Sequence, residues 1–278
     1  MSFLKTVNRL FKPVIHPFNL NNDGVKTYAM WQLEKGEETI KNYLSYTTKE
    51  EMFYNKTILD IGCGAGGKSL YYITLGAEHV FGVDVVASYK DESETLAATL
   101  GLSDKFTFIH ADAKNLPYPD GSFDTIIMND AMEHVGEPEE VLKEVLRVLK
   151  PGGKVYINFP PYNHPFGAHL SDAINIPWVH LFFSEKTLIK EYKELVKDLP
   201  DGKSRIDFRI SKNENGEEYF SYINKMTLKR FKKILKKLDI TPVYYNEMPL
   251  RNIVKFFARL PVFNEMFVKM AVCVIEKK

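Results

Sequence analysis

The sequence predicts an α/β fold built on a mainly parallel β-sheet with helices on both faces. Three observations carry this prediction. Short apolar runs rich in β-branched residues alternate with helical stretches of about ten to fifteen residues. The chain has 278 residues, of which 45% are hydrophobic, which is enough for a sizeable core. No internal repeat or low-complexity tract interrupts the alternation. We therefore expect any ligand at the carboxyl ends of the strands.

The expected elements follow in a regular order. A helix from about Tyr28 to Leu44 precedes the first strand, TILDIG. After it come a helix from Gly67 to Leu75, strand VFGVDVV, the helical stretch SYKDESETLAATLGL, strand FTFIHADA, strand FDTIIMND, a helix from Pro138 to Leu149 and strand KVYINFP. The helix Pro138–Leu149 has the clearest local signals, with a proline in its first turn, an apolar stripe and a Pro-Gly-Gly stop.

The composition argues against several classes of function. Lys+Arg 37 against Asp+Glu 36 gives a net charge of +1, which disfavours nucleic-acid binding. Cys63 and Cys273 are far apart and belong to no CxxC pair, so neither a disulfide framework nor a zinc knuckle is predicted, and a cytoplasmic location is expected. No run of about 18 apolar residues predicts a membrane span.

The N-terminal residues Met1–Phe18 have an amphipathic pattern. Apolar side chains recur at helical spacing, with basic residues between them, but the apolar core and cleavage site of a signal peptide are missing. The residues concerned are Phe3, Leu4, Val7, Leu10 and Phe11, with Lys5, Arg9 and Lys12. Three interpretations stay open: a helix packed on the domain, a helix lying on a bilayer surface, or a segment folded over a pocket.

The stretch ILDIGCGAGG indicates a nucleotide or nucleoside site. Gly62, Gly64 and Gly67 satisfy GxGxxG between a strand and a helix, where missing Cβ atoms allow a ligand to approach the backbone closely. About twenty residues further on, Asp84 ends the second strand, at the place where a carboxylate accepts both ribose hydroxyls.

Two further acids favour S-adenosylmethionine over a dinucleotide. A carboxylate at Asp60, just before the turn, would repel a pyrophosphate but suits the cationic amino group of a methionine moiety. Asp112, at the end of the third strand, can accept from the exocyclic amine of adenine while the backbone N–H of Ala113 faces the ring. The ligand is therefore expected to be cationic.

These motifs, in this order, resemble those of the class I S-adenosylmethionine-dependent methyltransferases. The resemblance covers Thr57 to Phe159 and is carried by ILDIGCGAGG, VFGVDVV, ADAKNLPYPDGSFDTIIMNDAMEHV and EVLKEVLRVLKPGGKVYI. It implies a doubly wound, Rossmann-like, seven-stranded mixed sheet whose last strand is antiparallel. ITPVYYNEM and FVKMAVCVIEK, separated by a helical stretch, can supply the sixth and seventh strands.

The resemblance also implies a set of cofactor-binding residues. Asp60, Gly62, Gly64 and Gly66 would surround the methionine part, Asp84 and its neighbour Val85 the ribose, and Asp112 and Ala113 the adenine, with Asn129 and Asp130 near the sulfonium. Cys63 belongs to the same turn, where it matches a position that packs rather than reacts. Glu133 and His134, from MEHV, are more typical of a helix start than of catalysis.

The acceptor is expected to contact an insertion after the fifth strand. We predict an N-terminal helical cap at residues 1–56 and a methyltransferase domain at residues 57–278, with a substrate cap inserted at about 160–222. Pro160–Tyr162 favours an extended path, and SRIDFRISKNENGEEYFSYIN is interpreted as two strand-like arms around a turn.

Histidines in this insertion are candidates for a general base. His169 is the first choice and His164 the second, because an imidazole titrates near neutral pH. Two alternatives stay open: the histidines order the loops of the cap, or two of them bind zinc or iron together with Asp172.

The sequence thus predicts a methyltransferase that acts on an O or N atom of a small molecule. An apolar acceptor and a peripheral membrane contact fit the amphipathic N-terminus and the lysine-rich helix MTLKRFKKILKKL, whose apolar stripe is expected to face the core. The alternatives are an NAD(P)-dependent oxidoreductase, which Asp60 and Asp112 disfavour, and a protein that binds S-adenosylmethionine without transferring its methyl group.

Overall fold

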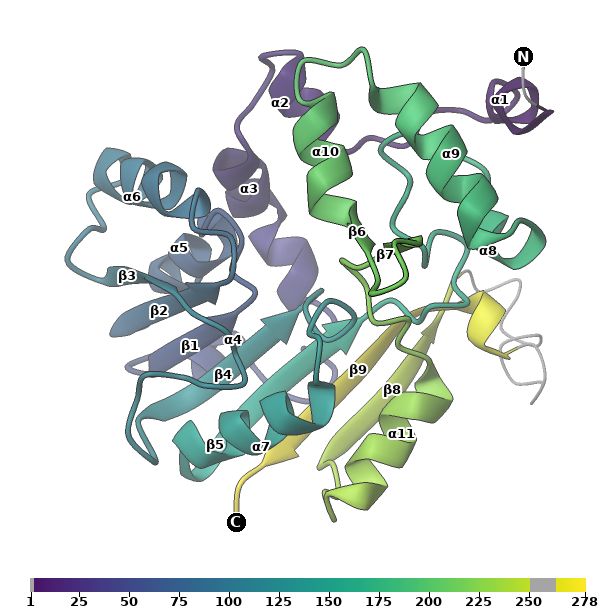
Figure 1. Ribbon diagram of the computed structural model, residues 1–278. Helices are drawn as coiled ribbons and strands as arrows, with labels where there is room; N and C mark the ends of the chain where they lie inside the picture. Colours follow the sequence, from purple (N-terminus) through teal and green to yellow (C-terminus); the bar gives the residue numbers. More distant parts are fainter. Residues whose placement is uncertain (1–2, 251–263) are drawn as a thin grey trace. The chain divides into compact units, whose positions relative to one another are not determined.

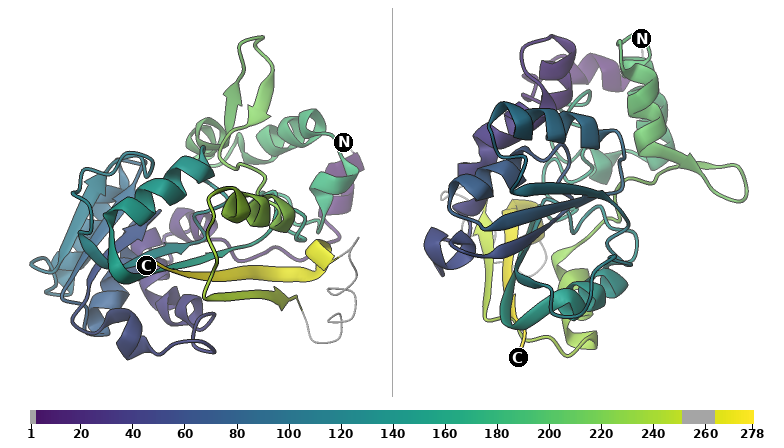
Figure 2. Two further views of the ribbon diagram at one scale, coloured as in Figure 1. Left: turned by 90° about the horizontal axis from the view of Figure 1, so that it is seen from below. Right: turned by 90° about the vertical axis from the view of Figure 1, so that its left-hand side faces the viewer.

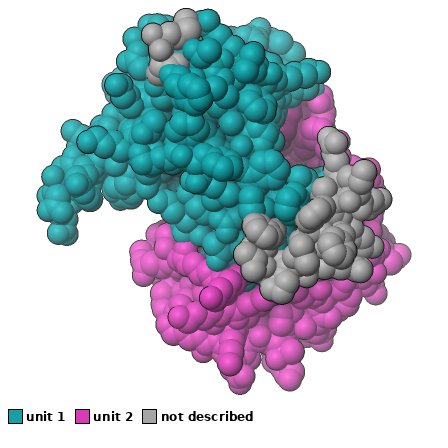
Figure 3. All heavy atoms as spheres, turned by 90° about the vertical axis from the view of Figure 1, so that its right-hand side faces the viewer, with its two compact units in different colours: residues 1–26, 160–228, 249–269 teal, residues 27–159, 229–248, 270–278 magenta. Residues whose placement is uncertain are grey.

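The computed structural model describes residues 3–250 and 264–278 of the chain. These residues form two compact units (Figure 3). We call residues 27–159, 229–248 and 270–278 the sheet unit, and residues 1–26, 160–228 and 249–269 the insertion unit. The predicted division into residues 1–56 and 57–278, with a substrate cap at about 160–222, stays a prediction.

The sheet has seven strands in the order β3-β2-β1-β4-β5-β9-β8, which confirms the predicted topology. The strands are β1 (Thr57–Ile61), β2 (His79–Asp84), β3 (Phe106–His110), β4 (Phe123–Asn129), β5 (Leu149–Phe159), β8 (Tyr244–Pro249) and β9 (Val268–Glu276). The first five pair in parallel, and β9 runs antiparallel to β5. The two C-terminal strands fall where the sequence predicted them, and the helical stretch expected between them lies largely outside the described residues.

Helices cover both faces of the sheet (Figures 1 and 2). On one face lie α3 (Tyr28–Ile40), α4 (Lys49–Phe53), α5 (Gly67–Thr74) and α6 (Tyr89–Thr99), and on the other α7 (Pro138–Val148) and α11 (Leu228–Lys237). The first group shares a buried core with the inner strands. The expected apolar stripes of α7 and α11 are buried, since both helices turn them toward the protein interior.

The insertion unit is mainly helical. It contains α1 (Phe3–Asn8), α2 (Pro17–Asn22), α8 (Val179–Phe182), α9 (Glu185–Val196), α10 (Gly202–Arg209), the hairpin β6 (Ile210–Lys212) and β7 (Glu218–Phe220), and the 3-10 helix η3 (Asn264–Phe267). No helix among the described residues is both long and apolar enough to cross a membrane.

Two local expectations for this unit were wrong. The N-terminal amphipathic pattern does not form one helix, because α1 ends at Asn8 and Pro13 and Pro17, which lack an N–H, lie in the following loop and at the start of α2. The first arm of the expected hairpin is helical as far as Arg209. Its alternating pattern suits a strand, but the helix places two arginines, one turn apart, against a buried carboxylate.

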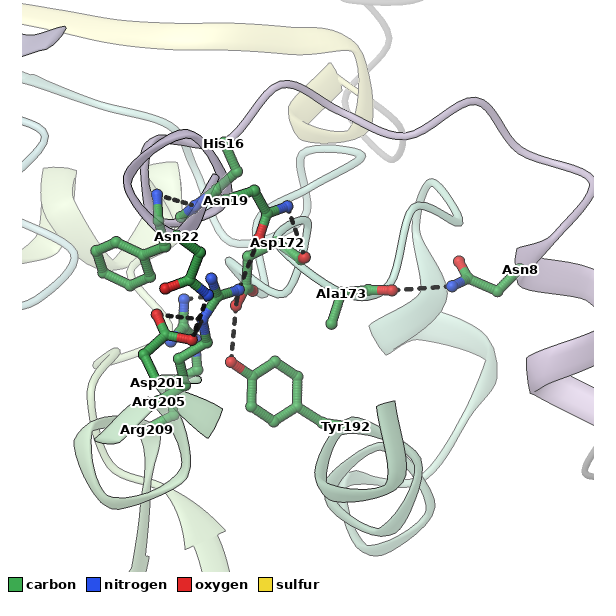
Figure 4. A network of polar contacts seen from close by, with 11 residues as sticks. Asn8, His16, Asn19, Asn22, Asp172, Ala173, Tyr192, Asp201, Arg205 and Arg209 are labelled. Atoms are coloured by element: carbon green, nitrogen blue, oxygen red, sulfur yellow. Dashed lines mark hydrogen bonds and ion pairs between the residues drawn. The ribbon is translucent and has the colours of Figure 1, made fainter. Parts of the chain in front are cut away.

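That carboxylate, Asp172, is the centre of a buried polar network (Figure 4). Tyr192 Oη donates to Asp172 Oδ2 at 2.8 Å, and Arg205 Nη1 lies 3.2 Å from the same oxygen. Arg209 Nη2 lies 3.3 Å from Asp172 Oδ1, and its guanidinium is close to the rings of Phe18 and Tyr192, among others. Both oxygens of Asp172 thus face arginines, which disfavours the alternative in which Asp172 ligates a metal.

Candidate functional site

The carboxyl ends of β3, β2, β1 and β4 are neighbours in the sheet. One residue predicted to bind the cofactor lies exposed just beyond each of these four ends: Asp112, Val85, Gly62 and Asp130. The sheet order therefore brings together residues that lie far apart in the sequence. An edge of this kind is the usual ligand site of an open parallel sheet.

The glycine turn after β1 has a backbone that other residues would strain. Gly62, Gly64 and Gly66 have φ values of 71°, 56° and 77°. A Cβ atom at Gly62 would lie 2.8 Å from the Cβ of Ala131. The backbone N of Gly62 donates to Val83 O at 2.8 Å and fixes the turn to β2. The turn thus exposes Gly62 beside the strand ends, whereas Gly64 and Gly66 are buried behind it.

Cys63 packs inside this turn. Its side chain is buried, and a Cβ atom on Gly82 of the neighbouring strand would come within 2.9 Å of its Sγ. Burial, and after it the carboxylates of Asp60 and Asp84, raise the pKa of the thiol well above its ordinary value. The thiol therefore stays protonated and fills space.

Asp84 joins the end of β2 to the glycine turn. Its Oδ2 accepts from the backbone N of Gly64, and its Oδ1 accepts from the backbone N of Val86, both at 2.9 Å. Burial raises its pKa, although these hydrogen bonds oppose the shift. Each carboxylate oxygen keeps further acceptor capacity. The neighbouring Val85 is 64% exposed, and its carbonyl is bonded to His110 Nε2 at 3.0 Å.

Asp60 is buried beneath the turn. Ser69 Oγ, from the first turns of α5, donates to Asp60 Oδ2 at 2.6 Å. Burial raises the pKa of Asp60 to about 6, while the Ser69 hydrogen bond and the Lys68 ammonium oppose the shift. A cationic ligand group beside Asp60 would favour the charged carboxylate.

Lys68 is a cation among these acids. Its Nζ lies 2.9 Å from Asp130 Oδ2, and its charge acts on both Asp60 and Glu133. Glu133 is buried, and this burial together with Asp130 raises its pKa well above the ordinary value. Sequence patterns did not single out Lys68, because its partner Asp130 lies 62 positions further along the chain.

Asp112 and Ala113 form a tight turn after β3. Asp112 Oδ1 accepts from the backbone N of Lys114 at 3.0 Å, and Asp112 itself is exposed. The backbone N of Ala111 donates to Asp84 O at 3.2 Å, which ties the ends of β3 and β2 together. Ala113 is buried.

Asn129 and Asp130, at the end of β4, face different surroundings. The side chain of Asn129 is buried: its Oδ1 accepts from Tyr43 Oη and from Asn158 Nδ2, both at 2.6 Å, and its Nδ2 donates to Tyr72 Oη at 2.9 Å. This amide is thus fully used within the core. Asp130, with φ 53°, is exposed, and its Oδ2 accepts from Lys68 Nζ at 2.9 Å.

The helix α3 also holds the glycine turn, a contact that the sequence did not reveal. Gln32 Nε2 donates to Cys63 O at 3.2 Å, and a Cβ atom on Gly67 would lie 1.9 Å from Ala29 O. Tyr28 lies over Gly64, and burial beside Tyr89 and Asp84 raises its pKa. The small residues Ala29 and Gly36, seven positions apart, were the available signal for this close packing.

The two candidate bases lie in the loop after β5, within the insertion unit. His164 Nδ1 accepts from the backbone N of Phe166 at 3.2 Å, and burial, with His180 nearby, lowers the pKa of His164 to about 4. His169 has a left-handed backbone, with φ 52°, and its ring centroid lies 6.5 Å from that of Tyr222.

Comparisons with known proteins find methyltransferases among the relatives of this chain. Residues 59–157 match the family model of a methyltransferase domain. The chain is 32% identical over 126 residues to the chloroplastic tocopherol O-methyltransferase of Arabidopsis thaliana, covering 45% of this chain and 36% of the relative. It is 38% identical over 96 residues to the sterol 24-C-methyltransferase ERG6B of Gibberella zeae, covering 34% and 25%. The match thus spans about a third or less of these relatives.

A solved structure supports the fold over most of the chain. An S-adenosylmethionine-dependent methyltransferase from Methanosarcina mazei superimposes with a TM-score of 0.50 at 23% identity, covering 85% of this chain and 96% of its own. At this identity the likeness establishes the fold. Together with the family match, it leaves the oxidoreductase alternative without support.

Proposed function

We propose that this chain, whose residues 59–157 form a class I S-adenosylmethionine-dependent methyltransferase domain, methylates an O or N atom of a small-molecule acceptor. One observation carries the proposal. The glycine turn, the carboxylate of Asp60 and the carboxylate of Asp84 meet at one edge of the sheet, where Gly64 N is bonded to Asp84. A glycine turn flanked by acids suits a nucleoside that carries cationic groups.

Each part of the cofactor has a matching group on the chain. We assign the ribose hydroxyls to Asp84, which has acceptor capacity left, with Val85 beside it. The remaining assignments are the methionine amino group to Asp60, the methionine part to Gly62, Cys63, Gly64 and Gly66 through their backbone, the adenine to Asp112 and Ala113, and the sulfonium region to Asp130 and the backbone of Asn129.

We assign the carboxylate of the methionine part to Lys68. The acids at this edge would repel that carboxylate, and the Lys68 ammonium, at the start of α5, already faces Asp130 at 2.9 Å. Only 12% of the lysine side chain is exposed, so its charge is weakly screened. Lys68 would thus balance the one negative group of a ligand that is otherwise cationic.

The protein's main contribution to the reaction is positioning. The bound cofactor supplies a methyl group already activated by its sulfonium. The chain must hold the acceptor in line and at near-attack distance, an effect worth roughly 7–11 kcal/mol. Residues of the insertion at about 160–222 are proposed to bind this acceptor. An apolar acceptor is consistent with the aromatic residues of that stretch.

We propose His169 as the base that takes the proton of an acceptor hydroxyl or amine. The pKa of His164, near 4, is too low for an efficient base at neutral pH, and its Nδ1 is bonded to Phe166, so it orders the loop instead. We also propose a reducing location such as the cytoplasm, since the described cysteines Cys63 and Cys273 are both free thiols.

The experiment that tests this function is transfer of a labelled methyl group. The chain is incubated with methyl-labelled S-adenosylmethionine and a panel of phenols, amines and apolar alcohols, and both S-adenosylhomocysteine and labelled product are measured. His169→Ala should lower turnover much more than cofactor affinity, and His164→Ala much less. Equal activity of the two variants would remove His169 as the base. Cofactor binding without transfer to any acceptor would favour the non-catalytic alternative.

A further inference from the structure

The first residues of the chain expose an unusual number of large apolar side chains. Leu10 is 81% exposed, Ile15 78% and Phe3 73%, and Phe11 is exposed as well. Of the expected apolar stripe, Leu4 is buried and Val7 packs partly against the insertion unit's core. Isolated exposed apolar residues are ordinary on a protein surface, but a group of four within thirteen residues marks an interaction site.

Leu10, Phe11 and Ile15 belong to a loop whose two ends are fixed by hydrogen bonds. Residues 9–15, which we call the N-terminal loop, are fixed at both ends by one short segment of the insertion unit. Before the loop, Asn8 Nδ2 donates to Ala173 O at 2.9 Å and Asn8 Oδ1 accepts from Asn175 N at 2.7 Å (Figure 4 shows Asn8 and Ala173). Toward its end, Val14 N donates to Asn175 Oδ1 at 2.8 Å. Leu10 and Phe11 lie between these bonds, Ile15 follows directly after them, and all three side chains are exposed.

The same region carries only positive charge. Arg9 and Lys12 are exposed and alternate with Leu10, Phe11 and Ile15. Residues 1–22 contain three basic residues and no acidic one, which gives +3, so the rest of the chain carries 34 basic against 36 acidic residues, or −2. The basic charge of residues 1–22 thus coincides with their exposed apolar side chains.

We propose that the N-terminal loop docks on the surface of a lipid bilayer with anionic headgroups. Leu10, Phe11 and Ile15 would enter the boundary between headgroups and acyl chains, and Arg9 and Lys12 would meet the headgroup charges. A bilayer accepts side chains that project from a loop, whereas a protein partner would need a matching groove. A second copy of the chain would bring two basic loops together, and their repulsion opposes such a pairing. This docking is independent of the proposed methyl transfer.

Vesicle sedimentation of the full chain tests the proposal. Vesicles of phosphatidylcholine alone are compared with vesicles of phosphatidylcholine and phosphatidylglycerol, at low and at high salt. The anionic vesicles should bind the chain about tenfold or more tightly than the neutral ones, and salt should weaken that binding. Failure of the unmodified chain to sediment with the anionic vesicles would overturn the proposal, and would leave a protein partner as the occupant of the loop.

Two double variants test whether vesicle binding depends on the N-terminal loop or on the rest of the surface. Leu10→Ser with Ile15→Ser, and Arg9→Gln with Lys12→Gln, should each reduce binding about tenfold or more. Two matched controls should leave it unchanged: Phe182→Ser, at a side chain of the same unit that is 75% exposed, and Lys229→Gln with Lys233→Gln on the exposed face of α11. A loss in either control as large as in the loop variants would contradict docking by the loop. Affinity for S-adenosylmethionine, measured on every variant, should not change.

Discussion

The carboxylate of Asp84 accepts a hydrogen bond from the backbone N of Gly64 at 2.9 Å. This bond joins the end of the second strand to the middle of the glycine turn, two features separated by twenty residues. It fixes the turn in a left-handed conformation at Gly64 and holds the carboxylate beside an open edge of the sheet. The proposed cofactor site depends on this relationship.

Gly64→Ala should lower both stability and affinity for S-adenosylmethionine. The new Cβ would lie 2.7 Å from Gln32 Nε2, and Gly64 has φ 56°. Gly101→Ala is the matched control, since Gly101 has φ 67° but nothing within 4 Å of a new Cβ. Each alanine costs about 1–2 kcal/mol for the left-handed backbone. Thermal unfolding should show a larger loss for Gly64→Ala, and only this variant should bind the cofactor less tightly. Equal losses would show that the turn tolerates a side chain.

Affinity for S-adenosylmethionine should depend on the protonation of Asp60. The pKa of Asp60 is raised to about 6, so the free protein loses this negative charge as the pH falls through about 6. The cationic amino group of the ligand prefers the charged form, and affinity should therefore fall by up to about tenfold per pH unit below that point. Calorimetry across this range checks it. Asp60→Asn should bind weakly with no such dependence, and an unchanged profile in that variant would assign the titration to another group.

Lys68→Met should weaken S-adenosylmethionine binding by about tenfold or more, because the ligand carboxylate loses its cation. Decarboxylated S-adenosylmethionine should bind the variant and the unmodified chain equally well. Lys68→Arg should keep most of the affinity, and Lys90→Met, at an exposed lysine of α6, is the control for a general change in charge. If both ligands lose affinity to the same extent, Lys68 acts on the shape of the site and not on the carboxylate.

The elements that could be predicted are those with strong local patterns. The strands that contain Asp60, Asp84 and Asn129 are short apolar runs with a polar residue at or next to their end, and α7 combines an apolar stripe with clear start and stop signals. The order of these elements along the chain, together with the resemblance of their motifs to a known family, allowed the sheet topology to be predicted. The site residues at the strand ends followed from the same logic, because parallel strands end at one edge.

The features that could not be predicted depend on contacts distant in sequence. Gln32 has no local pattern that indicates its bond to Cys63 O, and the strand position of Asn129 did not indicate that its amide would be used by Tyr43 and Tyr72. The period of RIDFRI fits a strand, but a helix allows Arg205 and Arg209 to reach Asp172 together. Tertiary burial of an ion network here outweighs the local preference.

The insertion unit should lose stability in mild acid. Burial lowers the pKa values of His16, His164 and His180 to about 4. The unfolded chain takes up these protons as the pH falls below 6.5, whereas the folded chain takes them up only near pH 4. The contribution of these histidines to the free energy of unfolding is therefore complete above pH 6.5 and is lost as the pH falls from 6.5 to about 4. Each pKa unit of difference is worth about 1.4 kcal/mol. Urea unfolding followed over this range should show the loss.

The double variant His164→Gln with His180→Gln checks the origin of this pH dependence. It should flatten the decline of the free energy of unfolding in acid, whatever its effect at neutral pH. His110→Gln is the comparison, because His110 belongs to the sheet unit and is exposed. If the free energy of unfolding falls as steeply in the double variant as in the unmodified chain, groups other than His164 and His180 cause the pH dependence.

The most direct test of the proposed cofactor site is calorimetric titration of the chain with S-adenosylmethionine, S-adenosylhomocysteine and NAD. It is carried out on the unmodified chain, on Asp84→Ala and on Asp91→Ala, the last being an exposed acid of α6 that serves as the control. We expect the first two ligands to bind the unmodified chain and Asp91→Ala, and to lose about a hundredfold in affinity with Asp84→Ala. Binding of NAD alone, or equal affinity of Asp84→Ala for S-adenosylmethionine, would contradict a cofactor site at the Asp84–Gly64 junction.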